Sequence, residues 1–175
     1  MSIESIFKIL PNKLSDNKVI TPYNIAEKMV DDVLSNIDLE LKTTFLDPVC
    51  KSGIFLKILY DKLMNHPLLV KSFKKPEDRS EHILENMLYG IALDELSVMI
   101  AKRTLHGQLV KNKNIVYIKD YERNVKEKKY KEVRDLIEKE FGKDMKIGVI
   151  IGNPPNNDNE SRGGSIVEML FTRIS

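Results

Sequence analysis

The tetrapeptide Asn153-Pro154-Pro155-Asn156 is the strongest chemical signal in the sequence. It comes just after the apolar run Ile147–Ile151, which is typical of a strand buried on both faces of a parallel sheet. The Asn153 amide oxygen and the Pro154 carbonyl can accept the two hydrogens of an amine, and the prolines stiffen the backbone so that both acceptors converge. An amine conjugated with a ring is a poor nucleophile, and such acceptors favour charge development on its nitrogen. The pattern therefore predicts amine activation that needs neither a metal nor a general base of matched pKa.

Three further polar groups follow apolar segments of the chain. They are the stretch from Asp47 to Gly53, the pair Asp94-Glu95 and the pair Asp120-Tyr121. Because ligands of open α/β sheets bind outside the carboxyl ends of the strands, we expect these groups to meet at one edge. Together they suit a ligand with a cation, ribose hydroxyls and a base amine. Asp47 would accept from an ammonium group, and Gly53 would tolerate positive φ before a helix whose free N–H groups suit a carboxylate.

The elements that position these residues follow from hydrophobic periodicity. Helices are predicted over 24–37, 54–63, 81–88, 94–105 and 126–141, and strands over 43–49, 89–93, 114–118 and 147–151. Thr21-Pro22 predicts the start of the first helix, with Thr21 as its cap. In the helix over 94–105, the residues Leu96, Met99, Ile100 and Leu105 are expected on the apolar face. A break is expected at Pro67 and over 71–79. The alternation of strands and helices predicts an α/β fold with a doubly wound, mainly parallel sheet.

The composition excludes several classes of protein. The chain has 175 residues, 42% of them apolar, which is enough for one compact domain, and its net charge of +2 excludes an acidic disordered chain. Cys50 is the single cysteine, so a disulfide framework and a Cys-rich zinc site are excluded, and the scattered histidines predict no metal site. No apolar run approaches the roughly 18 residues of a membrane span, and the N-terminus does not have the pattern of a secretory signal. We therefore expect a cytoplasmic protein that does not contact a membrane.

Five motifs resemble those of the S-adenosylmethionine-dependent DNA N6-adenine methyltransferases of restriction-modification systems. D-P-V-C-K-S-G-I-F-L at 47–56 resembles the cofactor motif, usually D-P-x-C-G-S-G-x-F-L, and I-I-G-N-P-P at 150–155 resembles the catalytic motif, usually followed by tyrosine. Thr21-Pro22, G-I-A-L-D-E at 90–95 and K-D-Y at 119–121 are similar to the remaining three. Their order and spacing agree from Thr21 to about Ile174. This resemblance implies a Rossmann-like methyltransferase fold.

The resemblance also implies a cofactor, a substrate and a set of residues. The cofactor would be S-adenosylmethionine, and the substrate an adenine flipped out of DNA. Asp47 and Gly53 would hold the methionine part, Asp94 and Asp120 would hold the adenosine part, and Tyr121 would pack on its adenine ring. The residues implied for cofactor binding are Thr21, Pro22, Asp47, Pro48, Cys50, Ser52, Gly53, Asp94, Asp120 and Tyr121, and those implied for catalysis are Asn153, Pro154, Pro155 and Asn156.

Structural interpretations of several of these residues stay open beside the functional ones. Asp94 would equally serve as the cap of the helix that follows it. Asp120 and Tyr121 would equally be a turn aspartate and a core tyrosine. Cys50 is interpreted as a small buried side chain and not as a nucleophile.

The sequence departs from the family pattern at four positions. Asn156 stands where an aromatic residue normally stacks on the flipped base, and stacking is worth about 1–3 kcal/mol per base. Ala92 stands where a glutamate normally binds the ribose, Lys51 replaces the first glycine of the cofactor loop, and Gly148 stands where an aspartate is common. We therefore expect weak or absent catalysis if nothing compensates for Asn156.

Two other functions remain open. The first is a cofactor-binding fragment or degenerate subunit without activity of its own. The second is a protein-glutamine methyltransferase, because methylation of an amide nitrogen can use the same Asn-Pro-Pro geometry. A nicotinamide-binding domain is disfavoured, because the G-x-G-x-x-G fingerprint is missing.

The position of the last motif bears on domain organisation. Residues 1–20 are expected to form an N-terminal segment, and 21–175 a methyltransferase domain that is incomplete at its C-terminus. Family sheets continue with further strands and a target-recognition region beyond the Asn-Pro-Pro motif, so we expect the strands after the fourth to be missing. An exposed edge beside Ile147–Ile151 is then expected, to be covered by a second copy of the chain, a restriction or specificity subunit, or the missing region.

Overall fold

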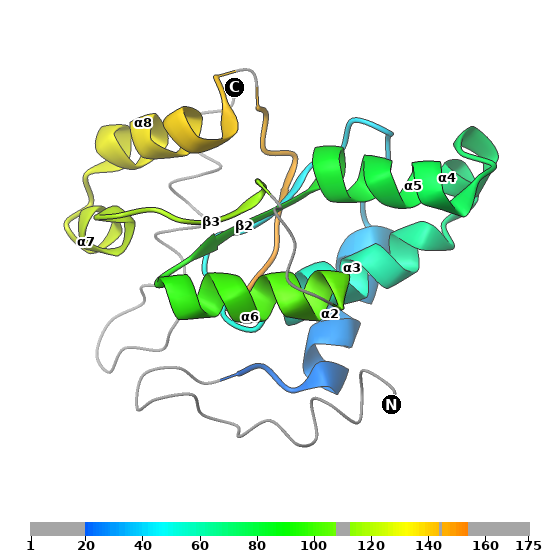
Figure 1. The fold of residues 1–175 in the computed structure, drawn as a ribbon, viewed down its shortest axis with the longest axis horizontal. Helices are drawn as coiled ribbons and strands as arrows, with labels where there is room; N and C mark the ends of the chain where they lie inside the picture. The colour runs from blue at the N-terminus through cyan, green and yellow to red at the C-terminus, as the bar shows by residue number, and fades with distance from the viewer. Residues whose placement is uncertain (1–19, 108–112, 144, 154–175) are drawn as a thin grey trace.

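The computed structural model describes residues 20–107, 113–143 and 145–153, which form one parallel sheet with helices on both faces (Figure 1). The sheet has four strands in the order β3-β2-β1-β4, and every neighbouring pair is parallel. The strands are β1 (Phe45–Asp47), β2 (Leu88–Ala92), β3 (Ile115–Tyr117) and β4 (Val149–Ile150). This strand order is that of the doubly wound, Rossmann-like folds, so the predicted fold class is confirmed.

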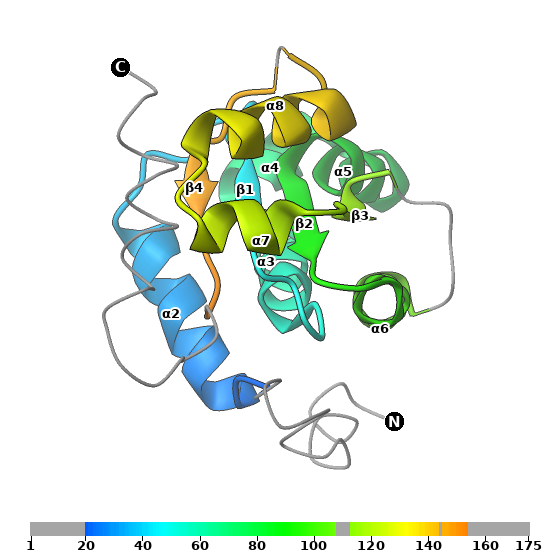
Figure 2. The ribbon, with the colours of Figure 1, turned by 90° about the vertical axis from the view of Figure 1, so that its left-hand side faces the viewer.

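The helices form two layers because successive residues of a strand point to opposite faces of the sheet. Phe45 packs into a core shared with α2 (Tyr23–Ser35), α3 (Ile54–Met64) and α6 (Glu95–His106). Leu46 packs into the opposite core, shared with α7 (Tyr121–Lys126) and α8 (Tyr130–Phe141). Figure 2 shows the strands between these two layers.

The stretch predicted as a break contains two short helices, α4 (Pro67–Ser72) and α5 (Pro76–His82). Each proline lies in the first turn of its helix, where a missing N–H removes no helical hydrogen bond, so these prolines start helices. The helix predicted over 81–88 is instead the end of α5 and a π-helical turn, η1 (Ile83–Met87), which leads directly into β2. Asn114 Nδ2 donates to the carbonyls of Leu84 and Glu85, which otherwise end a helix without partners.

The strand β4 lies at the edge of the described sheet. Val149 and Ile150 are half-buried, because β4 pairs with β1 on one side and no described strand pairs with it on the other. The prediction of a strand buried on both faces is therefore wrong for these two residues, whereas Ile151 just after them is buried. The helix predicted over 126–141 is also shorter, because Lys128 has a φ of 56° and separates α7 from α8.

Helix α6 exposes two apolar side chains that the periodicity placed inside. Leu96 and Met99 are 62% and 51% exposed, whereas Ser97, Ala101 and Leu105 face the core. The small side chains at 97 and 101 face inward because α6 packs closely on α3, as the surroundings of Gly53 show. The prediction is therefore wrong for Leu96 and Met99, whereas Leu105 is buried as expected.

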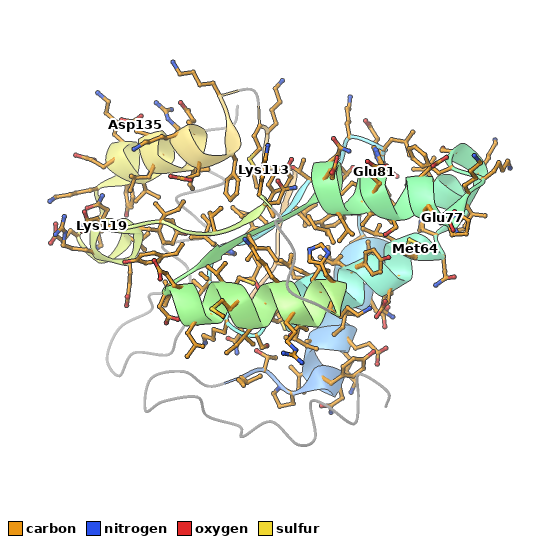
Figure 3. All side chains as sticks on the ribbon, viewed as in Figure 1. Met64, Glu77, Glu81, Lys113, Lys119 and Asp135 are labelled. Carbon is orange, nitrogen blue, oxygen red and sulfur yellow. The ribbon has the colours of Figure 1, made fainter. Side chains whose placement is uncertain are left out.

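Charged side chains make up much of the outer surface. Glu77, Glu81, Lys119 and Asp135 are exposed and point away from the sheet (Figure 3). Among the described helices, none is long and apolar enough to cross a membrane.

Candidate functional site

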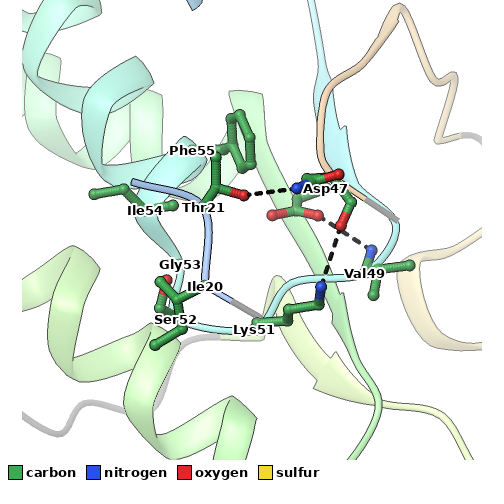
Figure 4. Close-up of a pocket in the computed structure, with 10 residues that line it drawn as sticks. Ile20, Thr21, Asp47, Val49, Lys51, Ser52, Gly53, Ile54 and Phe55 are labelled. Atoms are coloured by element: carbon green, nitrogen blue, oxygen red, sulfur yellow. Dashed lines mark hydrogen bonds between the residues drawn. The ribbon is translucent and has the colours of Figure 1, made fainter. Parts of the chain in front are cut away.

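A small pocket lies at the carboxyl ends of β1 and β4 (Figure 4). These strands are parallel neighbours in which Leu46 lies opposite Ile150, and the Ile151 N–H donates to the Leu46 carbonyl at 3.0 Å. The loops that follow the two strands therefore leave the sheet side by side, as expected for an open α/β sheet. The residues of this pocket that concern its chemistry are Thr21, Asp47, Lys51, Ser52, Gly53 and Asn153.

Asp47 is a buried carboxylate whose charge is only partly compensated. It is 2% exposed, and its Oδ1 accepts a hydrogen bond of 3.1 Å from the Val49 N–H. Burial raises the pKa of Asp47 from 3.8 to about 7, against the opposing effects of the Val49 N–H and the Lys51 charge. A cationic ligand beside this carboxylate would favour its ionised form. The environment of Asp47 therefore suits an ammonium group.

Gly53 provides the tight turn between the loop and α3. Its φ of 74° lies in the left-handed region, and it is the residue directly before α3. A Cβ at this position would lie 2.9 Å from Ala101 Cα and 3.0 Å from the Ala101 carbonyl oxygen, so α3 begins in close contact with α6. Both the φ and this contact require glycine, which confirms the expected positive φ. The first N–H groups of α3 are available for an anionic group such as a carboxylate.

Asn153 is exposed at the mouth of the pocket and is held from two sides. Its Nδ2 donates to Thr21 Oγ1 at 3.2 Å, and its main-chain carbonyl accepts from Lys51 Nζ at 3.4 Å. The side-chain oxygen of the amide is thereby turned away from Thr21. Because Asn153 is exposed, an amine of a substrate can approach its side-chain amide.

The role of Thr21 differs from the predicted one. Pro22 is the residue directly before α2, with a φ of −56° and ψ of 144°, and no side chain caps this helix. The Thr21 hydroxyl is instead the acceptor for Asn153, and Thr21 is 6% exposed. The two residues start α2 as predicted, but Thr21 does not cap it. Pro22 is exposed and is not among the residues of the pocket.

The remaining residues predicted in the loop after β1 are buried. Cys50 is 1% exposed, its N–H donates to the Ile91 carbonyl at 2.8 Å, and burial raises the pKa of its thiol. This agrees with a small buried side chain and not with a reactive thiolate. Ser52 is 2% exposed and lines the pocket, and Pro48, which follows Asp47, is buried.

The residues predicted to bind the adenosine part of the cofactor do not line this pocket. Asp94 caps α6, with its Oδ1 accepting from the Ser97 N–H at 2.8 Å. Asp120 has a φ of 67° and forms an ion pair of 3.3 Å with Arg123. Tyr121 is a core residue at 1% exposure, so its ring is covered by the protein. Asp94 and Tyr121 thus have the cap and core positions of their structural interpretations, and the roles implied for them toward a bound cofactor stay predictions.

The sequence did not identify Lys51 as a residue of the site. Its only sequence signal was the departure from the family glycine. Lys51 is not among the described residues with positive φ, so this turn does not need a glycine there. Partial burial lowers the pKa of Lys51, and the charge of Asp47 opposes that effect. The apolar residue Ile20, which also lines the pocket, gave no signal, whereas Phe55 belongs to the quoted cofactor motif.

The pocket is small. Its free space is about 10 Å³, which is room for about one water molecule. A larger ligand would place only one end here and extend outside it. Pro154, Pro155 and Asn156 lie outside the described residues, and the described part of the chain contains no cluster of His, Cys, Asp or Glu that would hold a metal ion.

Comparisons with known proteins find similarity to restriction-modification methylases. The sequence model of the Eco57I restriction-modification methylase family matches residues 86–168. A curated protein of Mycoplasma pneumoniae (strain ATCC 29342 / M129 / Subtype 1), called "Uncharacterized adenine-specific methylase", is 28% identical over 115 residues, which cover 62% of this chain and 26% of that protein. The solved structure of the ATP-dependent Type ISP restriction-modification enzyme LlaBIII bound to DNA is similar with a TM-score of 0.59 and 18% identity, over 90% of this chain and 12% of that one.

The resemblance to restriction-modification methylases is confirmed. The family match includes β2, α6 and the Asn-Pro-Pro motif, and the structural likeness supports the Rossmann-like fold. The chain spans 26% of the curated relative and 12% of the solved structure, so it corresponds to one part of each of those proteins.

Proposed function

We propose that this chain carries the cofactor pocket and the catalytic loop of a DNA methyltransferase. The reaction would transfer a methyl group from S-adenosylmethionine to the N6 amine of adenine in DNA, within a restriction-modification system. The observation that carries the proposal is the pocket that Asp47, Gly53 and Asn153 share at the carboxyl ends of β1 and β4. A site for a cationic amino acid group and an amide for an amine substrate thus lie side by side.

The residues around Asp47 fit the methionine part of S-adenosylmethionine. The buried Asp47 carboxylate would pair with the ammonium group, and the N-terminus of α3 would receive the carboxylate. The cofactor supplies an electrophilic methyl group on a sulfonium. The pocket has room for about one water-sized group, so only the ammonium group would enter it and the rest of the cofactor would lie outside.

Asn153 and Pro154 would act on the target amine. The Asn153 amide oxygen and the Pro154 carbonyl would accept the two amine hydrogens, so that charge develops on the nitrogen as it attacks. Thr21 would hold the amide in the required orientation through its bond to Nδ2. The substrate would be an adenine flipped out of DNA, which the exposure of Asn153 allows.

The partners of the chain follow from the same proposal. DNA is the substrate, and a restriction or specificity subunit, or a further C-terminal region, would supply recognition of the target sequence. The edge of β4 in the described sheet is the surface where such a region, or a second copy of the chain, would pair.

Two measurements test the proposal. Calorimetric titration with S-adenosylmethionine should show binding, and absence of binding at millimolar ligand would contradict the cofactor. Transfer of a labelled methyl group to adenine-containing DNA should then be measured for the native chain and for Asn153→Ala. The Asn153→Ala variant should keep cofactor binding and lose transfer, because the substitution keeps the main-chain carbonyl that contacts Lys51 and removes the amide that would contact the substrate.

A chain that binds the cofactor without activity of its own is the second candidate. Two departures from the family pattern favour it. Ala92, which is 1% exposed, stands where a ribose-binding glutamate is expected, and Asn156 stands where an aromatic residue is expected. Asn156→Tyr restores the stacking residue and should raise transfer by roughly one to two orders of magnitude. If both chains bind cofactor and neither methylates DNA, the second candidate is the better one. A glutamine-containing peptide in the same assay separates protein-glutamine methylation from both.

A further inference from the structure

Lys51 reaches from the loop after β1 to the loop after β4. Its Nζ donates to the main-chain carbonyl of Asn153 at 3.4 Å, and the side chain points across the pocket toward Asp47 (Figure 4). Lys51 stands where the similar methyltransferases usually have a glycine, and its backbone does not need one. A glycine at this position would leave the Asn153 carbonyl without this contact.

The carbonyl that Lys51 contacts has a special place in the catalytic loop. It belongs to the peptide unit that joins Asn153 to Pro154. Proline has no N–H, so hydrogen bonds can hold this peptide unit only through its carbonyl oxygen. A donor at that oxygen therefore restrains the plane that connects the two proposed acceptors of the target amine.

Lys51 is also one of the residues that line the proposed cofactor pocket. The negative charge of Asp47 stabilises the Lys51 ammonium group, while partial burial disfavours it. Lys51 thus lies between the carboxylate proposed to hold the cofactor and the carbonyl next to the proposed catalytic prolines. Thr21 approaches Asn153 at its side chain, and Lys51 approaches it at its main chain.

We propose that Lys51 is a positioning residue, which holds the Asn153–Pro154 peptide unit in the geometry that activates the target amine. This inference rests on the proposed function and goes beyond it by assigning a role to a residue that departs from the family pattern. Misplacement of reacting groups by about 1 Å can cost about a hundredfold in rate, so a restraint on this plane matters.

Three variants test the role. Lys51→Met keeps the aliphatic stem and removes the charge and the donors, Lys51→Arg keeps a cationic donor, and Lys71→Met is a matched control on the exposed surface of α4. With saturating cofactor and DNA, Lys51→Met should lower kcat about tenfold and change the Kd for S-adenosylmethionine by less than about threefold. Lys51→Arg should recover most of the loss, and Lys71→Met should behave as the native chain.

Two outcomes of these assays overturn the proposal. If Lys51→Met weakens cofactor binding and leaves kcat unchanged at saturation, Lys51 is a ligand of the cofactor. If Lys51→Met is indistinguishable from Lys71→Met, the contact with Asn153 has no role.

A measurement on the ligand-free protein separates failure of this proposal from failure of the proposed function. Hydrogen exchange over residues 149–153 should become several times faster in Lys51→Met than in the native chain, and remain unchanged in Lys71→Met. Unchanged exchange in Lys51→Met would show that Lys51 does not restrain the loop, which overturns the proposal even if the native chain methylates DNA. Faster exchange in Lys51→Met, together with a native chain that neither binds cofactor nor methylates DNA, would keep the restraint and overturn its catalytic role along with the proposed function.

Discussion

The Asn153 side-chain amide donates to the Thr21 hydroxyl at 3.2 Å, across a separation of 132 residues in the chain. Thr21 precedes α2, and Asn153 follows β4. The contact joins the motif at the start of the described chain to the proposed catalytic motif at its end. It also assigns the amide nitrogen to Thr21, which directs the amide oxygen elsewhere.

Removal of the Thr21 hydroxyl should therefore impair catalysis more than folding. Thr21→Val keeps the branched shape but removes the acceptor, and the bond is worth about 1 kcal/mol. We expect the rate of methyl transfer in a single turnover to fall about tenfold. Without the Thr21 hydroxyl, the Asn153 amide would adopt its flipped orientation and other rotamers besides the reactive one. Thr21→Ser, which keeps the hydroxyl, is the control. A native rate in Thr21→Val would show that the hydrogen bond does not orient the amide.

The pKa of Asp47 predicts a pH dependence of cofactor binding. Burial raises this pKa from 3.8 to about 7, and only the ionised carboxylate pairs with an ammonium group. Below pH 7 a proton must leave before the cofactor binds, so the affinity should fall by about tenfold per pH unit in the acid range and level off above about pH 8. Calorimetry at several pH values measures this. Asp47→Asn should bind weakly with little pH dependence, and an equally steep dependence in that variant would assign the proton to another group.

The same group makes a prediction for stability. The pKa of Asp47 is higher in the folded chain than its ordinary value of 3.8, so the folded state holds the proton more tightly. The stabilisation this gives is complete below pH 3.8 and is lost as the pH rises through about 7. The free energy of unfolding of Asp47→Asn relative to the native chain should therefore increase between pH 4 and pH 8, as urea titrations can show. A constant difference would contradict the raised pKa.

Gly53 and Gly107 form a matched pair for testing the contact between α3 and α6. Both have positive φ, 74° and 71°, but a Cβ at Gly53 meets the Ala101 backbone at 2.9 Å, whereas a Cβ at Gly107 has nothing within 4 Å. Gly107→Ala should lose only the cost of the left-handed backbone, about 1–2 kcal/mol. Gly53→Ala should lose about 1–3 kcal/mol more, because backbone atoms of α6 must move. Urea unfolding measures both, and equal losses would contradict the close approach.

The parts of this fold that the sequence predicted are those that depend on local pattern. The parallel strands, the positive φ of Gly53 and the start of α2 at Thr21-Pro22 follow from runs of apolar residues and from turn chemistry. The half-burial of β4 depends on what pairs with its free edge, which periodicity does not contain. The contact of Lys51 with Asn153 needs the knowledge that β1 and β4 are neighbours, and a single sequence does not give strand order.

The exposure of Leu96 has a tertiary cause. Leu96 was assigned to a face from its type and spacing, but the packing of the whole helix decides which face turns inward. In α6, the close approach at Gly53 turns the small residue Ala101 toward α3, and this rotation leaves Leu96 outside. Tertiary packing thus overrides the local pattern where a helix touches another backbone.

Gly152 provides the last prediction, because it lies against the Asp47 carboxylate of the proposed cofactor pocket. A Cβ at Gly152 would be 2.7 Å from Asp47 Oδ1, and this oxygen is already held by the Val49 N–H in a buried place. The φ of Gly152 is not positive, so Gly152→Ala adds no backbone strain and acts through the carboxylate. We expect a loss of about 1–3 kcal/mol in the free energy of unfolding and at least about a tenfold loss of affinity for S-adenosylmethionine.

Two further variants decide whether Gly152→Ala acts through Asp47. Gly148→Ala places a Cβ 3.3 Å from the Thr44 carbonyl at the other end of β4, so it should leave cofactor affinity unchanged. In an Asp47→Ala background the clash partner is gone, and the stability cost of Gly152→Ala should largely disappear. Additive losses in this double-mutant cycle would mean that the cost of the methyl group arises elsewhere. A large coupling free energy between the two positions would instead show that the methyl group acts on the Asp47 carboxylate. The conformation of the loop after β4 would then affect the carboxylate on which the proposed cofactor site depends.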